Sequence, residues 1–180
     1  DCPEGYVQTL SGQTKCFICP AGVSCNKDST SDDPLTSFCS AGYYSLDGGA
    51  DCIICPSGYQ CKETYLKPRK CQHIREYAPE GSVFCLGCPA GFRCPDPASA
   101  PEMCPQGSYS YSGDGVCKPC FPGYVCLSGS KSPAPQGQEA LKGTYIPLNN
   151  GGNSISCPRG YFGIKFAARG MFDGCDICPA

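Results

Sequence analysis

The chain has 180 residues, of which 19, about 11%, are cysteine, a share typical of disulfide-held modules and foreign to ordinary intracellular proteins. Leu, Ile, Val and Phe together make up about 16% of the chain and Trp is absent, too little apolar sequence for the sheet or barrel scaffolds of most enzymes. Fourteen basic and sixteen acidic residues give a net charge of -2, and so even a balance gives no reason to expect a nucleic-acid or membrane-surface partner. No apolar run approaches the roughly 18 residues that would span a membrane.

An internal repeat organises the cysteines. Cys-x-x-Cys pairs begin at Cys16, Cys52, Cys85, Cys117 and Cys175, and each follows another cysteine by 13 to 18 residues. Five repeats are expected at residues 1–25, 39–61, 71–94, 104–126 and 157–180, with linkers at 26–38, 62–70 and 95–103 and a cysteine-free stretch at 127–156 that is read as a linker or an excursion loop.

The odd cysteine count fits a truncated fifth repeat. In the first four repeats the last cysteine follows the Cys-x-x-Cys pair by six residues, and Cys178 has no such partner before Ala180. We therefore expect the chain to be a segment of a longer protein, with the missing cysteine just after residue 180.

Within a repeat, Cys-Pro-x-Gly-Tyr predicts a turn followed by a short strand. Proline fixes one φ angle, glycine supplies a positive φ, and the aromatic ring covers a disulfide. A further short strand is expected in residues 143–148, and no segment has helical periodicity beyond two turns. The predicted fold class is small and disulfide-rich, mostly loops and short antiparallel strands, with the repeats in an elongated array.

The Cys-x-x-Cys pairs have three interpretations. A structural zinc site needs four converging ligands, and four thiolates per repeat could supply them, but His73 is the only histidine. A redox motif needs a βαβ context that is absent. Disulfides are favoured, and no metal or cofactor is expected, although the pairing is open because four cysteines allow three connectivities. The candidates are Cys2, Cys16, Cys19, Cys25, Cys39, Cys52, Cys55, Cys61, Cys71, Cys85, Cys88, Cys94, Cys104, Cys117, Cys120, Cys126, Cys157, Cys175 and Cys178.

Cys-Pro-x-Gly-Tyr, a gap of about a dozen residues and Cys-x-x-Cys-Pro-x-Gly-x-x-Cys together resemble the ephrin-receptor-like cysteine-rich repeat, a relative of EGF-like and tumour-necrosis-factor-receptor modules. The resemblance covers most of the chain outside the linkers and 127–156. It implies tandem disulfide modules of an extracellular protein. Such repeats occur in receptor ectodomains, matrix proteins, adhesins and surface filaments, so the resemblance does not choose a function.

Residues 161–172 are the most apolar segment of the chain. Phe162, Ile164 and Phe166 alternate with Gly163 and Lys165, as in a half-buried strand, and Met171 and Phe172 follow. Packing within the repeat is the preferred interpretation, and an assembly contact is the alternative.

Other sites carry weaker signals. Thr30, Ser31, Ser128, Ser130 and Ser132 are candidate O-glycosylation sites, while no Asn-x-Ser/Thr sequon is present. The basic cluster of Lys67, Arg69, Lys70, His73 and Arg75 could bind a sulfated glycan but reads first as a solvated linker. Asp1, Asp32 and Asp33 are a poor match to a calcium site.

No catalytic set of side chains is present in the sequence, so an enzyme is not expected. The favoured function is an extracellular structural protein whose repeats form a rigid stalk or a protomer of a surface filament or matrix. The alternative is the ectodomain of a cell-surface receptor or adhesion protein that binds a protein or glycan. The partners expected are further copies of the chain, other extracellular proteins or glycans, with no nucleic acid.

Overall fold

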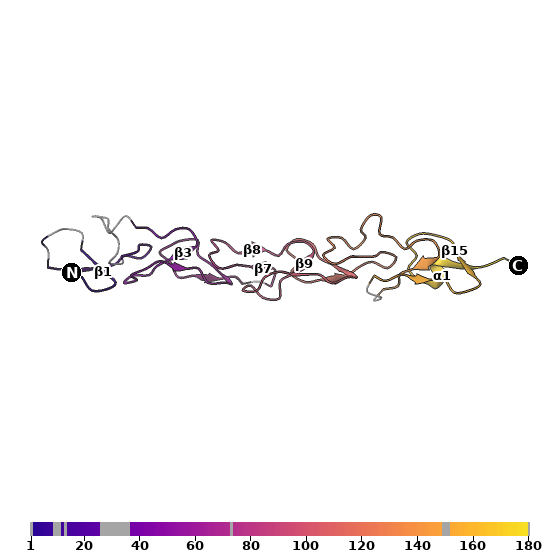
Figure 1. The fold of residues 1–180 in the computed structure, drawn as a ribbon, viewed down its shortest axis with the longest axis horizontal. Coiled ribbons are helices and arrows are strands. Elements are labelled where there is room, and N and C mark those ends of the chain that lie inside the picture. The colour runs from indigo at the N-terminus through magenta and orange to yellow at the C-terminus, as the bar shows by residue number, and fades with distance from the viewer. Residues whose placement is uncertain are drawn as a thin grey trace. The chain divides into compact units, whose positions relative to one another are not determined.

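The computed structural model describes residues 2–8, 12, 14–25, 37–72, 74–148 and 152–179. Within these residues the chain forms turns, very short strands and one four-residue helix, α1 (Met171–Gly174) (Figure 1). The strands are β1 (Tyr6–Val7), β2 (Phe17–Ile18), β3 (Tyr43–Tyr44), β4 (Ile53–Ile54), β5 (Tyr59–Gln60), β6 (Arg69–Lys70), β7 (Glu76–Tyr77), β8 (Leu86–Gly87), β9 (Phe92–Arg93), β10 (Glu102–Met103), β11 (Ser108–Tyr109), β12 (Lys118–Pro119), β13 (Thr144–Tyr145), β14 (Ile155–Ser156), β15 (Tyr161–Gly163) and β16 (Cys175–Ile177). The predicted class, disulfide-rich with short antiparallel strands, is confirmed.

Two compact units divide the chain, one of residues 1–86 with 96–100 and the other of residues 87–95 with 101–180. The loop 96–100 belongs to the first unit because the Pro97 carbonyl accepts the Ala78 N–H at 2.9 Å. The antiparallel strand pairs include β1–β2, β3–β4 and β5–β6 in the first unit, and β9–β10, β11–β12, β13–β14 and β15–β16 in the second.

The structural building block is about half as long as one sequence repeat together with the linker that follows it. We call it a half-repeat: a tight turn and the strand pair or bridge that follows it, ending where the next turn begins. The half-repeats with a glycine as fourth residue begin at Cys2, Cys19, Cys39, Cys55, Cys88, Cys104, Cys120, Ala140 and Cys157. The N–H that opens the next half-repeat donates to the carbonyl of that glycine, as from Cys19 to Gly5 at 2.8 Å.

Glycine is required by the turn itself. In the first half-repeat the Tyr6 N–H donates to the Pro3 carbonyl at 3.1 Å, and Gly5 has a φ of 79°. A positive φ at the third of four residues defines a type II turn, in which L side chains are strained. The same bond recurs in the second unit, from Phe92 to Pro89 at 3.2 Å.

Two kinds of disulfide alternate along the half-repeats between Cys2 and Cys126. Wide bridges join cysteines 13 to 18 residues apart, and narrow bridges join cysteines six residues apart. The bridges are Cys2–Cys16, Cys19–Cys25, Cys39–Cys52, Cys55–Cys61, Cys71–Cys85, Cys88–Cys94, Cys104–Cys117, Cys120–Cys126 and Cys157–Cys175. The two members of each complete Cys-x-x-Cys pair therefore belong to different bridges and different half-repeats.

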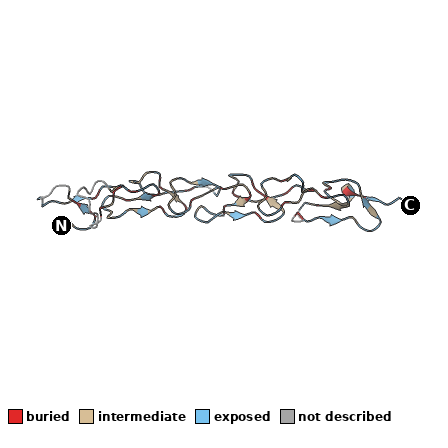
Figure 2. Ribbon diagram, turned by 45° about the horizontal axis from the view of Figure 1, so that its top comes forward, coloured by how far each residue is buried: buried red, intermediate tan, exposed pale blue. Residues whose placement is uncertain are grey.

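The core of each unit consists of disulfides and small side chains. Most strand residues are exposed or half-buried (Figure 2), whereas Cys19, Cys55, Cys88 and Cys104 are fully buried. Ser45 is also buried, and its hydroxyl donates to the Val23 carbonyl at 2.9 Å, so the polar group is satisfied.

The stretch 127–156, expected to be a linker or an excursion loop, contains a half-repeat that lacks sulfur. Ala140 and Ile146 lie six residues apart, as in a narrow bridge, and each is 1% exposed. The Gly123 N–H donates to the Ile146 carbonyl at 2.8 Å, and the Ile146 N–H donates to the Ala168 carbonyl at 2.9 Å. The short strand predicted in residues 143–148 is confirmed as β13.

The shorter expected linkers are also part of the hairpins. Residues 62–70 contain β6 and residues 95–103 contain β10, and each strand pairs with the strand of the preceding turn. They follow the last cysteine of their repeat because a narrow bridge closes before the second strand begins. Of residues 26–38, only 37 and 38 are described, and Phe38 forms an antiparallel bridge with Val23.

The turn glycines make a testable prediction. A Cβ on Gly91 would lie 2.2 Å from the Gly129 carbonyl oxygen, whereas one on Gly113, which also has a positive φ, would meet nothing within 4 Å. Gly113→Ala should lower the free energy of unfolding by about 1 kcal/mol through its φ alone, and Gly91→Ala by about 3 kcal/mol because a clash is added. Urea unfolding without reductant measures both, and equal losses would contradict the close contact.

A second prediction concerns the sulfur-free half-repeat. The double variant Ala140→Cys/Ile146→Cys should form a tenth disulfide, because the four narrow bridges join positions with the same six-residue separation. Alkylation without reduction, followed by mass measurement, should find one reactive thiol, as in the parent chain. Ala140→Ser/Ile146→Ser, the matched variant without a bond, should melt at a lower temperature. Three reactive thiols in the cysteine variant would refute the assignment.

Candidate functional site

Eighteen of the nineteen cysteines form the disulfide frame described above, and Cys178 is the exception. Its thiol is free and exposed, and its N–H donates to the Gly160 carbonyl at 2.9 Å. Cys178 thus occupies the opening position of a half-repeat, where a narrow bridge would start. The partner expected six residues later stays a prediction.

One group of side chains in the described residues has the spacing of metal ligands. A sulfur of Cys71, a sulfur of Cys85 and a carboxylate oxygen of Glu76 lie within 4.8 Å of one another. The two sulfurs are bonded to each other as a disulfide. Because zinc binds thiolates, this cluster does not offer a zinc site.

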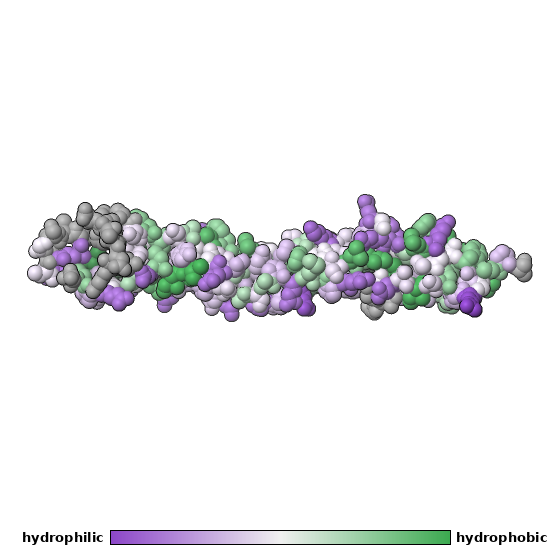
Figure 3. Space-filling view, viewed as in Figure 1, coloured by the Kyte–Doolittle hydropathy of each residue, from purple (hydrophilic) through white to green (hydrophobic). Residues whose placement is uncertain are grey.

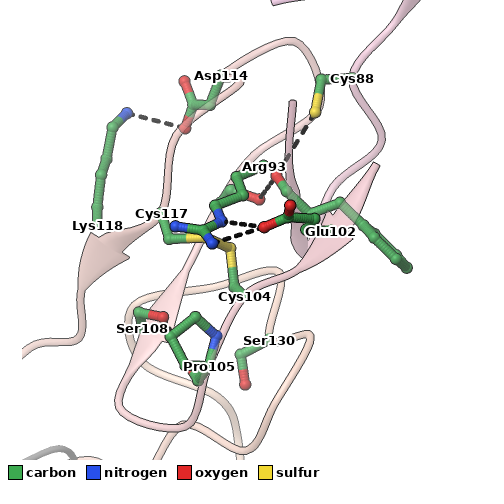
Figure 4. Close-up of a disulfide and its surroundings, with 12 residues drawn as sticks. Cys88, Arg93, Glu102, Cys104, Pro105, Ser108, Asp114, Cys117, Lys118 and Ser130 are labelled. Carbon is green, nitrogen blue, oxygen red and sulfur yellow. Dashed lines mark hydrogen bonds and ion pairs between the residues drawn. A yellow bond between two sulfur atoms is a disulfide. The ribbon is translucent and has the colours of Figure 1, made fainter. Parts of the chain in front are cut away.

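Charged side chains lie around the Cys104–Cys117 disulfide and form ion pairs there (Figure 4). Arg93 on β9 and Glu102 on β10 are direct partners in the strand register, and their Nη2 and Oε2 atoms lie 2.5 Å apart. Both side chains are about half exposed, so the ion pair contributes little to stability. This pair was not predictable from the sequence, because Glu102 lies in a stretch that was expected to be a linker.

The candidate assembly contact lies at the end of the second unit. We call it the C-terminal apolar surface and define it by the exposed side chains of Phe162, Ile164, Phe166 and Phe172. Phe172, on α1, is 95% exposed. Met171, the fifth residue predicted here, is half-buried.

The aromatic side chains of this segment are exposed, whereas the preferred interpretation placed them in the packing of their own repeat. In β15, Gly163 faces inward, where a Cβ would lie only 1.7 Å from the Gly143 nitrogen. Side chains on a strand alternate between its two faces, so Phe162 and Ile164 point away from the close contact. The predicted alternation does not extend through the segment, because β15 ends at Gly163 and the next three residues, Ile164, Lys165 and Phe166, are all exposed.

Polar contacts hold the C-terminal apolar surface in place. Asp173 accepts hydrogen bonds from the Lys165 ammonium and from the Arg169 backbone N–H. These donors, Lys165 first, hold the pKa of Asp173 below its ordinary value. The Lys142 ammonium lies 5.6 Å from the centre of the Phe166 ring, a distance typical of cation–π contacts.

Apolar exposure is not confined to this surface. Figure 3 shows green, hydrophobic residues on the outside of both units, interspersed with hydrophilic ones. Phe17, Leu66 and Met103 are each more than half exposed. Cores this small cannot cover every apolar side chain. The C-terminal apolar surface is distinguished by four exposed apolar side chains within eleven positions, two of them more than half exposed.

The candidate glycosylation sites differ in what their hydroxyls do. Ser128 is exposed, whereas the Ser130 hydroxyl donates to the Leu127 carbonyl at 2.6 Å and the Ser132 hydroxyl accepts the Ala134 N–H at 3.3 Å. Ser128 is therefore the best placed of the three. Thr30 and Ser31, like Asp1, Asp32, Asp33 and His73, lie outside the described residues.

Comparisons with known proteins add no family. Neither the protein-family models nor the curated proteins searched contain a match to this chain.

The C-terminal apolar surface predicts self-association. With Cys178→Ser as background, to exclude intermolecular disulfides, the chain should sediment faster as its concentration rises. Phe166→Ser/Phe172→Ser should remove that dependence because it removes two exposed rings from the contact. Phe17→Ser, which deletes a ring 60% exposed in the first unit, is the control and should leave it unchanged. Monomeric sedimentation of the background chain at all concentrations would contradict an assembly contact.

Proposed function

We propose that this chain is a structural part of an extracellular protein, in which tandem disulfide-closed repeats form a rigid stalk or a protomer of a surface filament or matrix. The observation that supports the proposal most is the continuous backbone bonding between half-repeats. Each unit consists of short hairpins whose turns donate to the hairpins that follow, and bending such a stack requires breaking hydrogen bonds.

The bonding recurs at corresponding positions in both units. In the first, the Gly22 N–H donates to the Ser45 carbonyl at 3.1 Å; in the second, the Gly91 N–H donates to the Ser110 carbonyl at 3.0 Å. Bonds also run back: the Gly48 N–H donates to the Cys19 carbonyl at 2.9 Å. The donors and acceptors are backbone groups at fixed positions in the half-repeat. The same contact between half-repeats can therefore recur with few requirements on the side chains.

The extracellular location is proposed from the cysteine chemistry. Nine disulfides in a chain of this length form and persist in oxidising compartments, not in the reducing cytosol. Among the described residues, the single short helix falls far below the length needed to cross a bilayer. The likeness to ephrin-receptor-like repeats is part of the same proposal.

Small-angle X-ray scattering tests the stalk. A compact globule of 180 residues has a radius of gyration of about 16 Å, and we expect the oxidised chain to exceed this clearly while keeping the scattering of a stiff particle. Reduction should turn it into a flexible chain. The chain has too little apolar sequence to offset the entropy cost of ordering by itself, and the disulfides lower that cost. A radius near 16 Å in the oxidised state would refute a stalk. Electron microscopy then separates a filament protomer, which forms regular fibres, from a dispersed receptor ectodomain.

A further inference from the structure

The first unit carries a concentration of positive charge that the chain as a whole does not have. Five of the fourteen Lys and Arg residues fall within residues 62–76, against two carboxylates, in a chain of net charge -2. Lys67, Arg69, Lys70 and Arg75 are all exposed. None of the ion pairs between described residues involves any of these four. Lys70 is close enough to Asp96 to help lower the pKa of that carboxyl, after the Ser99 and Ala98 hydrogen bonds.

Two residues of the basic cluster lie in a strand, within the stretch that the sequence predicted to be a linker. Arg69 and Lys70 form β6, opposite Gln60 and Tyr59 of β5 respectively. The Cys71 N–H fixes the end of the strand by donating to the Gly58 carbonyl at 2.9 Å. Because neighbouring residues of a strand start on opposite faces, Arg69 and Lys70 reach a common ligand only through their long, flexible side chains.

Arg69 and Lys70 line a surface hollow of about 320 Å³. The Cys71–Cys85 disulfide, Gln60, Gln72, Glu76 and Phe84 complete its wall. The Gln60 Oε1 atom accepts the Cys85 N–H at 3.4 Å, so the group that Gln60 can offer a ligand is its NH₂ donor. Phe84 is 55% exposed and presents an apolar ring at the edge of this polar hollow.

This mixture of groups fits a sugar better than a bare anion. Two cations can bind a sulfate or carboxylate group, while the two amides and the Glu76 carboxylate can bond to hydroxyl groups. The exposed Phe84 ring can pack against the C–H face of a sugar ring. With two cations and one carboxylate, the hollow has a net positive charge and attracts anions. The Glu76 carboxylate repels a ligand that has negative charge but no hydroxyl group to donate to it.

We propose that this hollow, which we call the basic hollow, binds one acidic sugar unit of an anionic polysaccharide, with Lys67 and Arg75 available to charged groups farther along the chain. Sulfate and carboxylate share the chemistry that Arg69 and Lys70 recognise. The proposal is independent of the stalk, because a compact chain in solution could present the same hollow.

The test measures binding of the oxidised 180-residue chain to immobilised heparin, which carries both groups, to hyaluronan, which carries only carboxylates, and to neutral dextran. We expect binding to heparin at physiological salt, none to dextran, and a hyaluronan affinity that says whether carboxylate alone suffices. Arg69→Gln/Lys70→Gln should weaken heparin binding about tenfold, as loss of two exposed charge contacts implies, and should flatten its salt dependence. Phe84→Ala should weaken it about threefold, by removing a modest packing contact.

Lys15→Gln/Lys131→Gln is the matched control, because it removes the same charge from two exposed lysines outside the hollow. It should change heparin affinity less than twofold, and mass measurement without reduction should find the nine disulfides in every variant. An equal loss in the control, or binding of duplex DNA as tight as that of heparin, would overturn the proposal in favour of unselective attraction of polyanions. Absence of heparin binding at physiological salt would also overturn it.

Discussion

The structure depends on disulfides that close short loops where a hydrophobic core would otherwise be needed. Closing a loop of about 15 residues stabilises a fold by about 3 kcal/mol in the chain-entropy model, and each wide bridge closes a loop of this order. The cysteines themselves fill the interior: Cys19, Cys55, Cys88 and Cys104 are fully buried. Because the bonds are local in sequence, each bridged half-repeat is closed by its own cysteines, and backbone hydrogen bonds join it to its neighbours.

A half-repeat can nevertheless form without a disulfide. Ala140 and Ile146 are buried where a narrow bridge would lie, and the Ala140 N–H still donates to the Gly123 carbonyl at 2.7 Å. Apolar packing and backbone bonds therefore sustain the same geometry once its neighbours are bridged. Ala167 makes a similar point, since its φ of 53° and its bond to the Ala140 carbonyl reproduce the role that Gly129 has against Cys104.

The candidate surfaces are also a consequence of the small core. With so few apolar residues buried, side chains such as Phe172 remain outside, and charges are arranged by strand register, as for Arg93 opposite Glu102. Sequence reasoning found both the apolar segment and the basic cluster, because composition along the chain is visible. It did not find their orientation. Gly163 faces inward and Arg69 lies on a strand because of backbone contacts with residues distant in the sequence, such as Gly143 and Gln60.

The sequence by itself determined the class of fold, because cysteine density and poverty in Leu, Ile, Val and Phe leave no other way to order the chain. It also determined where the turns lie, since proline and glycine restrict φ locally. Only the tertiary structure decided which cysteines bond, because four cysteines allow three pairings until their Cα atoms are brought within about 6 Å. It alone showed that the expected linkers complete the hairpins, since a short strand without alternation is defined by its partner and not by its own residues.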